Sequence, residues 1–117
     1  MAIDRAPIDQ MILDVGAPAF RRLALLFAEE TRGAVADIRR RLDAQDWREL
    51  GRQAHSLKNS TASFGLAALS ATALLLERAA DAAEAEAAAE QVGILETSTV
   101  AELAALETLL KRIELSA

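Results

Sequence analysis

Apolar residues recur at the spacing of a single helix face along most of this chain. Between residues 18 and 42 they follow one another three, four or seven residues apart, the repeat of an amphipathic α-helix. These positions are Phe20, Leu23, Phe27, Ala34, Ile38 and Leu42. Only two prolines and five glycines interrupt the 117 residues, so long helices are allowed throughout. We therefore expect an all-α fold.

The same repeat predicts four long helices, and a short first helix is predicted because Pro7 can open it and Gly16 and Pro18 can end it. They cover residues 7–15, 18–42, 47–64, 66–82 and 88–115. Asp46 can cap the third helix, and Gly65 fits the left-handed residue that closes it. Gly93 and the run 97–99 are points where the last helix can bend or start late. Because the connections are short, we expect an antiparallel up-down four-helix bundle with a short extra N-terminal helix, in one domain over residues 1–117.

Composition excludes several classes of function. The chain has no cysteine and one histidine, so it can form neither a disulfide nor a zinc site. The net charge of −5 argues against nucleic-acid binding, which needs a basic face. No apolar run approaches the roughly 18 residues of a membrane span, and the N-terminus lacks the apolar core of a signal peptide. We expect a cytoplasmic protein that binds neither nucleic acid nor membrane.

The single histidine, His55, is predicted to lie on the solvent side of the third helix. In steps of about 100° per residue, the apolar positions of that helix fall on one stripe. They are Trp47, Leu50, Ala54, Leu57, Thr61 and Phe64. His55 lies roughly 130° from the centre of this stripe by the same rule, and Lys58 follows one turn later. An exposed, unpaired imidazole beside a cation is suited to a nucleophile that must meet a large partner.

The residues around His55 resemble a known family. The matching residues are Asp46, Ala54–Lys58, Phe64–Leu66, Leu69 and Glu77. They are similar to the signature of histidine phosphotransfer (HPt) domains from multistep phosphorelays, and the similarity is sharpest over residues 46–77. In that family a glycine usually follows the lysine, whereas this chain has Asn59. The asparagine amide can donate an N–H to a phosphoryl oxygen.

The resemblance implies that His55 accepts a phosphoryl group from the aspartyl-phosphate of one receiver domain and passes it to an aspartate of another. Lys58 would stabilise the negative charge of the transition state, which is spread over three oxygens. Ser56 and Asn59 are auxiliary donors. The resemblance assigns Mg²⁺ to the receiver, so we expect no cofactor here. The implied partners are response-regulator receiver domains and a hybrid sensor histidine kinase, which makes this chain a phosphocarrier rather than an enzyme that turns over.

Partners are expected to dock on the helix face that carries His55 and Lys58. The residues expected to contact them are Arg48, Gly51, Arg52, Ser56, Asn59 and Ala62. The small residues Gly51 and Ala62 would let a receiver loop approach closely. A closed apolar core needs no second copy to fold, so we expect a monomer.

Two other classes of function are compatible with an exposed histidine on a helix. In a histidine kinase an acidic residue follows the histidine and a proline comes soon after, but here Ser56 follows and no proline occurs after Pro18. A glycine-rich phosphate loop is missing as well, so the kinase interpretation is rejected. A module that regulates a kinase or receiver by binding alone stays open, and Asn59 favours it. Acid-labile, base-stable phosphate on the protein would separate the two remaining functions.

Overall fold

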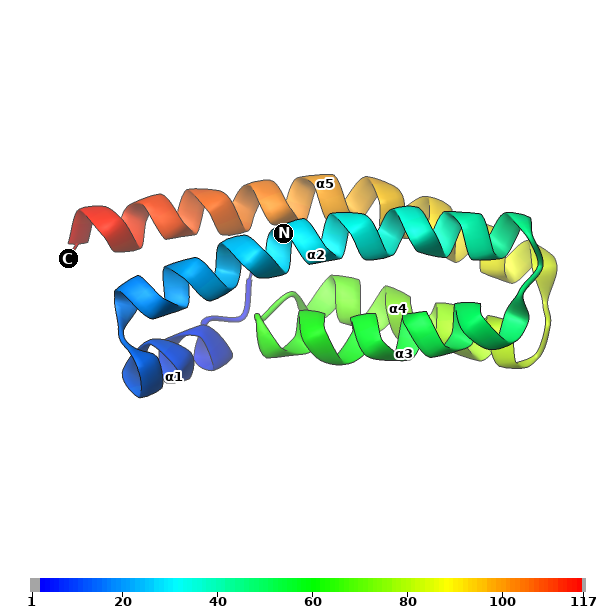
Figure 1. The fold of residues 1–117 in the computed structure, drawn as a ribbon, viewed down its shortest axis with the longest axis horizontal. Helices are drawn as coiled ribbons and strands as arrows, with labels where there is room; N and C mark the ends of the chain where they lie inside the picture. The colour runs from blue at the N-terminus through cyan, green and yellow to red at the C-terminus, as the bar shows by residue number, and fades with distance from the viewer. Residues whose placement is uncertain (1–2, 117) are drawn as a thin grey trace.

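Helices form all the regular secondary structure in residues 3–116, the part of the chain that the computed structural model describes, with side chains described for residues 3–113. They are α1 (Arg5–Val15), α2 (Ala17–Asp43), α3 (Trp47–Ser63), α4 (Ala67–Asp81) and α5 (Ala85–Ser116) (Figure 1). No strand occurs in this range, so the predicted all-α class is confirmed.

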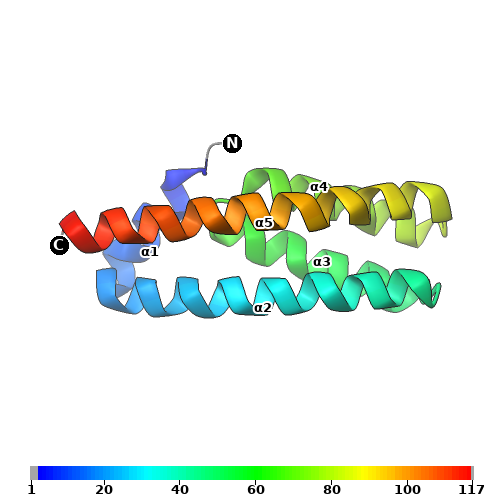
Figure 2. The same cartoon turned by 90° about the horizontal axis from the view of Figure 1, so that it is seen from above.

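The lengths of the helices determine how they pack. At about 1.5 Å per residue, the 32 residues of α5 match the 47 Å long axis of the molecule. The helices α3 and α4, with 17 and 15 residues, are about half as long. The four helices α2–α5 lie side by side, each in contact with two of the others (Figures 1 and 2), and α1 packs on α2 and α3 where α3 ends. None of the helices in residues 3–116 combines the length and apolarity that a bilayer crossing requires.

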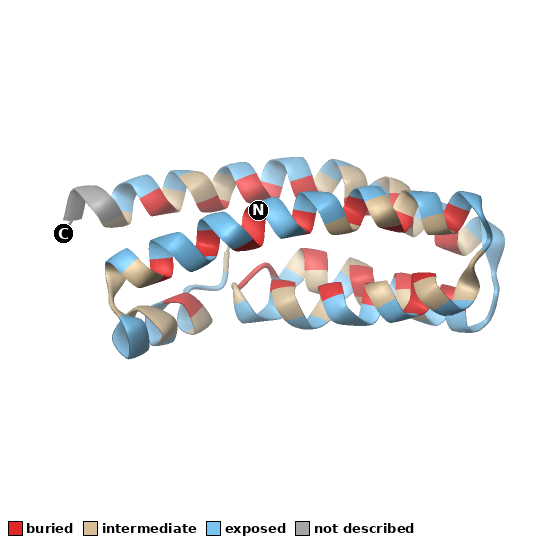
Figure 3. Cartoon of the chain, viewed as in Figure 1, coloured by how far each residue is buried: buried red, intermediate tan, exposed pale blue. Residues whose placement is uncertain are grey.

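An apolar core runs between the helices, and all five contribute to it (Figure 3). Fully buried side chains include Ile8 of α1, Phe20 of α2, Leu50 of α3, Leu76 of α4 and Leu106 of α5. Burial of each such side chain is worth roughly 1.5–3 kcal/mol. The helices are therefore held by their shared apolar faces rather than by intrinsic propensity alone.

The predicted buried stripe of α3 is confirmed, with one error on α2. Leu50, Ala54, Leu57 and Thr61 are buried, and Trp47 and Phe64 are partly buried at the two ends of the stripe. Phe64 stacks on Phe27 of α2 with 4.1 Å between ring centroids. Leu23 was also expected in the core, but it is 44% exposed. It lies at the edge of the apolar face of α2, whose centre is occupied by Ala24 and Phe27.

Local interactions explain where the helices begin. The Asp4 side chain accepts a hydrogen bond from the Ala6 N–H at 3.1 Å, so α1 begins at Arg5 rather than at the predicted Pro7. The Ala/Glu-rich stretch before α5 contains a turn in which Ala83 has a φ of 52°. The last helix begins directly after this turn, three residues before the predicted start at residue 88.

Two predicted features of the helix ends are confirmed, and the predicted late start of the last helix is wrong. Asp46 caps α3 by accepting the Glu49 N–H at 3.3 Å, and Gly65 adopts the left-handed conformation with a φ of 73°. The predicted weak points of the last helix do not interrupt it, because α5 continues through Gly93 and residues 97–99. Packing of its apolar face on α2 and α4 outweighs the low helix propensity of these residues.

Candidate functional site

His55 projects from the middle of α3 toward solvent. Its side chain is 53% exposed, while the adjacent Ala54 and Leu57 are buried. The helix backbone under the imidazole is thus fixed by the core. The predicted exposure of His55 is confirmed.

The imidazole is paired with a carboxylate from the neighbouring helix. His55 Nδ1 lies 2.8 Å from Glu77 Oε2 of α4, and Lys58 Nζ donates to Glu77 Oε1 at 2.8 Å. Lys58 Nζ also lies 3.3 Å from His55 Nδ1. The expectation of an unpaired imidazole is therefore wrong, because α4 packs on α3 and brings Glu77 within reach. We call His55, Lys58 and Glu77 the α3–α4 triad.

The triad assigns the proton of the neutral ring to Nδ1. An ionised carboxylate only accepts hydrogen bonds, so its short contact with Nδ1 requires an N–H there. With this proton on Nδ1, the ring has no lone pair there for Lys58 to donate to, so the 3.3 Å approach of Lys58 Nζ is a contact without a hydrogen bond. The Lys58 hydrogen bond lowers the pKa of the Glu77 carboxyl below its ordinary value of 4.5; partial burial opposes this, and the His55 ring adds to the lowering. Nε2 then keeps its lone pair and is the ring atom that can act as a nucleophile.

The two predicted auxiliary donors differ in their contact with the imidazole. Asn59 Nδ2 is 3.4 Å from His55 Nε2, so its amide reaches the nucleophilic nitrogen. Ser56 is exposed and lines a groove between α2 and α3. Of the two predicted donors, Asn59 is therefore the one that contacts Nε2.

Five of the six residues expected to contact a partner are exposed around His55. They are Arg48, Arg52, Ser56, Asn59 and Ala62. Gly51 is buried instead, and a Cβ at this position would lie 3.1 Å from Asp81 Oδ1 and 3.6 Å from Ala80 Cβ. The expectation that Gly51 offers space to a partner is wrong, because α4 already covers that side of α3.

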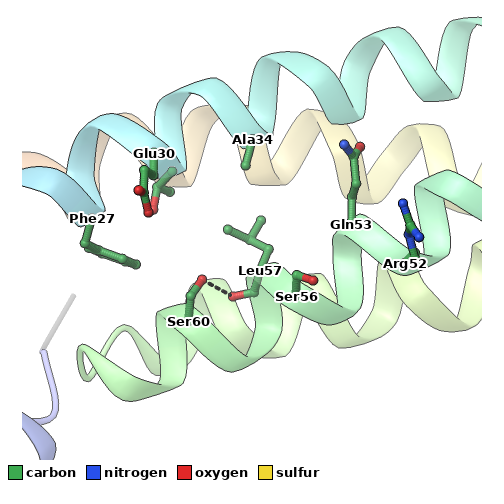
Figure 4. Close-up of a pocket in the computed structure, with 9 residues that line it drawn as sticks. Phe27, Glu30, Ala34, Arg52, Gln53, Ser56, Leu57 and Ser60 are labelled. Atoms are coloured by element: carbon green, nitrogen blue, oxygen red, sulfur yellow. Dashed lines mark hydrogen bonds between the residues drawn. The ribbon is translucent and has the colours of Figure 1, made fainter.

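Two open grooves flank the ridge of α3 that carries His55. The first, of about 650 Å³, lies between α2 and α3 (Figure 4). Its lining includes Phe27, Glu30, Ala34, Arg52, Ser56 and Leu57. The second, of about 340 Å³, is lined by residues of α3 and α4 and by the segment before α1. Its lining includes Asp4, Lys58, Ala62, Ser70 and Leu74. His55 lines neither of these two grooves, and its exposed side chain is accessible from solvent.

Glu77 is the site residue for which no role was predicted from the sequence. It belongs to the matching pattern, but it lies on a different helix from His55. The spacing within each helix does not give the rotation of α4 relative to α3. A signal was nevertheless present, because Leu76 and Ala80 are apolar positions that place Glu77 at the edge of the buried face of α4. A charged group there can reach the neighbouring helix.

Comparison with protein families gave a match to the Hpt domain over residues 22–115. These residues include α3, α4 and most of α2 and α5, and they contain the α3–α4 triad. Neither the curated proteins nor the solved structures gave a match. The family match covers far more than half of the chain. This chain therefore belongs to the Hpt domain family.

Proposed function

We propose that His55 is the phosphoryl carrier of this Hpt domain, taking the group from the aspartyl-phosphate of one receiver and passing it to another. Hpt domains perform histidine phosphotransfer in phosphorelays, and His55 is the single histidine of the chain. The observation that carries the proposal is the 2.8 Å contact between Nδ1 and Glu77. This contact leaves Nε2, on an exposed imidazole, with the lone pair that the attack requires.

In the transfer step, the Nε2 lone pair attacks the phosphorus atom of the receiver aspartyl-phosphate. An N–P bond forms while the bond between phosphorus and the aspartyl oxygen breaks, and its electron pair leaves on the aspartate carboxylate. The Nδ1 proton stays on the ring. The positive charge that the ring gains lies against the Glu77 carboxylate. Attack by the aspartate of a second receiver reverses these bond changes and restores the neutral ring.

The chain supplies positioning and charge to this step. Glu77 holds the ring through Nδ1, so the direction of the Nε2 lone pair is fixed before a partner arrives. The Lys58 ammonium lies on the Nδ1 side of the ring, 3.3 Å from that nitrogen, and its positive charge would act across the ring on the phosphoryl group at Nε2. Ser56 is an auxiliary donor from the side of the α2–α3 groove.

Membership of the family supports a wider proposal about the arrangement of the helices, the partners and the location of this protein. The helices α2–α5 would form an antiparallel up-down four-helix bundle, with α1 as an extra helix, in a single domain over residues 1–117. The partners would be response-regulator receiver domains and a hybrid sensor histidine kinase. The receiver would hold the Mg²⁺ ion, so this chain would need no cofactor. It would act in the cytoplasm as a monomer and as a phosphocarrier rather than an enzyme that turns over.

Receivers would dock over the exposed residues that surround His55. These are Arg48, Arg52, Ser56, Asn59 and Ala62. The grooves on either side of α3 offer space for the loops of a receiver. This placement supports approach of the aspartyl-phosphate along the solvent side of the ring.

The test is phosphotransfer from a panel of phosphorylated receiver domains to the wild-type protein and to His55→Gln, with folding checked by circular dichroism. We expect acid-labile, base-stable phosphate on the wild type and none on the variant. Gln is polar and similar in size at an exposed position, so the variant should fold normally. Tight receiver binding without any phosphate on the wild type would refute the proposal and identify a module that acts by docking alone.

A further inference from the structure

Asn59 stands one turn after His55 on the same face of α3, as residues four apart on a helix do. Its Nδ2 lies 3.4 Å from His55 Nε2. Because Glu77 accepts from Nδ1, Nε2 carries a lone pair and can accept a hydrogen bond from the Asn59 amide. Within residues 3–113, Asn59 is the residue whose side chain bonds this nitrogen. The amide therefore lies beside the nitrogen that a phosphorus atom must reach.

We propose that Asn59 is a positioning residue that slows phosphoryl transfer onto His55 and prolongs the life of the phosphohistidine. This inference rests on the phosphocarrier function proposed above. Before transfer, the amide N–H donates to Nε2, and this hydrogen bond must break to free the lone pair. After transfer, the same N–H donates to an oxygen of the phosphoryl group on Nε2.

The position of Lys58 supports this role for Asn59. The Lys58 ammonium contacts the opposite ring nitrogen, 3.3 Å from Nδ1, and is bonded to Glu77 at 2.8 Å. Asn59 is on the Nε2 side, where the phosphoryl oxygens will be. It forms no covalent bond and transfers no proton, so the balance of the transfer step is unchanged.

The size of the effect follows from the strength of one hydrogen bond. A net contribution of about 0.5–1.5 kcal/mol corresponds to a change of roughly 2- to 10-fold in a rate or an equilibrium. Asn59→Ala removes the amide but keeps a good helix former. We expect this variant to accept phosphate about 2- to 10-fold faster than the wild type, and its phosphohistidine to hydrolyse faster by a similar factor.

The experiment measures single-turnover transfer from one phosphorylated receiver, and separately the lifetime of phosphohistidine made with phosphoramidate as a small phosphodonor. Asn59→Ala is compared with wild type and with Ser63→Ala. Ser63 is a matched control because it is an exposed polar residue one turn further along α3, with its hydroxyl bonded to the Asn59 carbonyl at 3.0 Å. The ¹⁵N chemical shift of His55 Nε2 gives a third readout, which should move in Asn59→Ala and not in Ser63→Ala.

The outcomes separate this inference from the proposed function. Faster labelling, a shorter lifetime and a shifted Nε2 resonance in Asn59→Ala alone would support the inference. Unchanged labelling and lifetime in that variant would overturn it while leaving the phosphocarrier function intact. If no receiver labels even the wild type, the proposed function is wrong. The phosphoramidate lifetimes then decide on Asn59 by themselves, with equal lifetimes counting against it and a shorter lifetime in the variant supporting it.

Discussion

The two nitrogens of the His55 ring are controlled from two different helices. Glu77 of α4 accepts from Nδ1, and Asn59 of α3 lies at Nε2. The ring therefore has a fixed tautomer as well as a fixed direction. Lys58 balances the charge of Glu77 at 2.8 Å, so the carboxylate that orients the ring does not present an uncompensated negative charge to an incoming phosphoryl group.

Replacing Lys58 with alanine should raise the pKa of Glu77, because the Lys58 hydrogen bond is the main cause of its lowered value. A carboxyl whose pKa is lower in the folded state stabilises the fold at pH values above its unfolded-state pKa of about 4.5. This contribution is lost as the pH falls through the folded-state pKa. Lys58→Ala should thus lower the free energy of unfolding at pH 7 by roughly 1 kcal/mol, with less loss at pH 3. NMR titration of the Glu77 carboxyl measures the shift directly.

Arg32→Ala is the control for this prediction. Arg32 forms a comparable ion pair between helices, with Glu107 at 2.6 Å, but it does not touch the α3–α4 triad. It should leave the Glu77 titration unchanged. An unaltered Glu77 midpoint in Lys58→Ala would show that the ammonium does not hold this carboxylate in solution.

The exposed positions of the site could be predicted from sequence, whereas its contacts between helices could not. The 3.6-residue period of α3 placed His55 outside the core, because that period depends only on α3 itself. The period also placed Gly51 on the His55 side, yet Gly51 is buried under α4. Which flank of α3 is covered depends on where α4 packs, and this also decides that Glu77 reaches the imidazole. These facts require the tertiary arrangement.

At the scale of elements, the connection between α3 and α4 also holds the N-terminal segment. The Asp4 N–H donates to the Gly65 carbonyl at 2.8 Å, and a Cβ on Gly65 would collide with the Asp4 carbonyl oxygen. Asp4 also caps α1, so one short segment links the start of α1 to the end of α3. The same segment borders the groove that contains Lys58. Position 65 therefore requires glycine for two reasons: the Asp4 carbonyl leaves no room for a Cβ, and the backbone φ is positive.

Gly65→Ala should lower the free energy of unfolding by about 2 kcal/mol or more. The left-handed conformation at Gly65, with φ of 73°, costs an L-residue roughly 1–2 kcal/mol, and displacement of Asp4 adds to this. Urea denaturation measures the change. Gly33→Ala is the matched control, because Gly33 lies within α2 and a Cβ there meets nothing within 4 Å. That variant should gain roughly 0.5–1 kcal/mol, and equal effects of the two substitutions would contradict the assigned role of Gly65.

The helices themselves were more predictable than their ends and breaks. Apolar spacing gave four of the five, since the same residues that repeat along the sequence form the core, while Pro7, Gly16 and Pro18 gave the short first helix. The start of α1 was missed by two residues because Asp4 caps the helix upstream of Pro7, the residue predicted to open it. The continuity of α5 was underestimated at Gly93, where local propensity favours a break. Packing of Val92 and Leu95, both fully buried, supplies the stabilisation that local sequence rules leave out.

At the scale of the whole molecule, the unequal helix lengths leave α2 and α5 extending beyond α3 and α4, and α1 packs against the extended part of α2 (Figure 1). The core that results is apolar with few exceptions, of which Glu102 of α5 is the one acidic residue among the described side chains. It is only 3% exposed, and its Oε2 has no hydrogen-bond partner within the described residues. Burial raises the pKa of Glu102, and a hydrogen bond from the Leu69 N–H in the first turn of α4 opposes the rise.

Glu102→Gln should stabilise the protein at pH 7.5 by about 1 kcal/mol, because it removes the cost of a buried charge while keeping an oxygen that can accept from Leu69. The stability gained by Glu102→Gln depends on pH. A carboxyl whose pKa is higher in the folded state stabilises the fold most at pH values below its unfolded-state pKa of about 4.5. This stabilisation decreases as the pH rises from the unfolded-state pKa toward the folded-state pKa. The gain of the variant should therefore appear above about pH 4.5 and shrink at pH 4. The acid-sensitive carboxyls Asp37, Glu77 and Glu96, whose pKa values are lowered by their hydrogen bonds, affect both proteins equally and cancel in the comparison.

Urea denaturation at pH 4 and pH 7.5 measures this difference, with Glu90→Gln as the control from the exposed side of α5. The control should change stability by less than about 0.5 kcal/mol at either pH, as surface substitutions usually do. If Glu102→Gln instead lowered stability at pH 7.5, the ionised carboxylate would be a net stabilising partner of the first turn of α4. The contact between α4 and α5 would then rest on charge as well as on apolar packing. Since α4 also carries Glu77, the stability of this contact bears directly on how firmly the His55 ring is oriented.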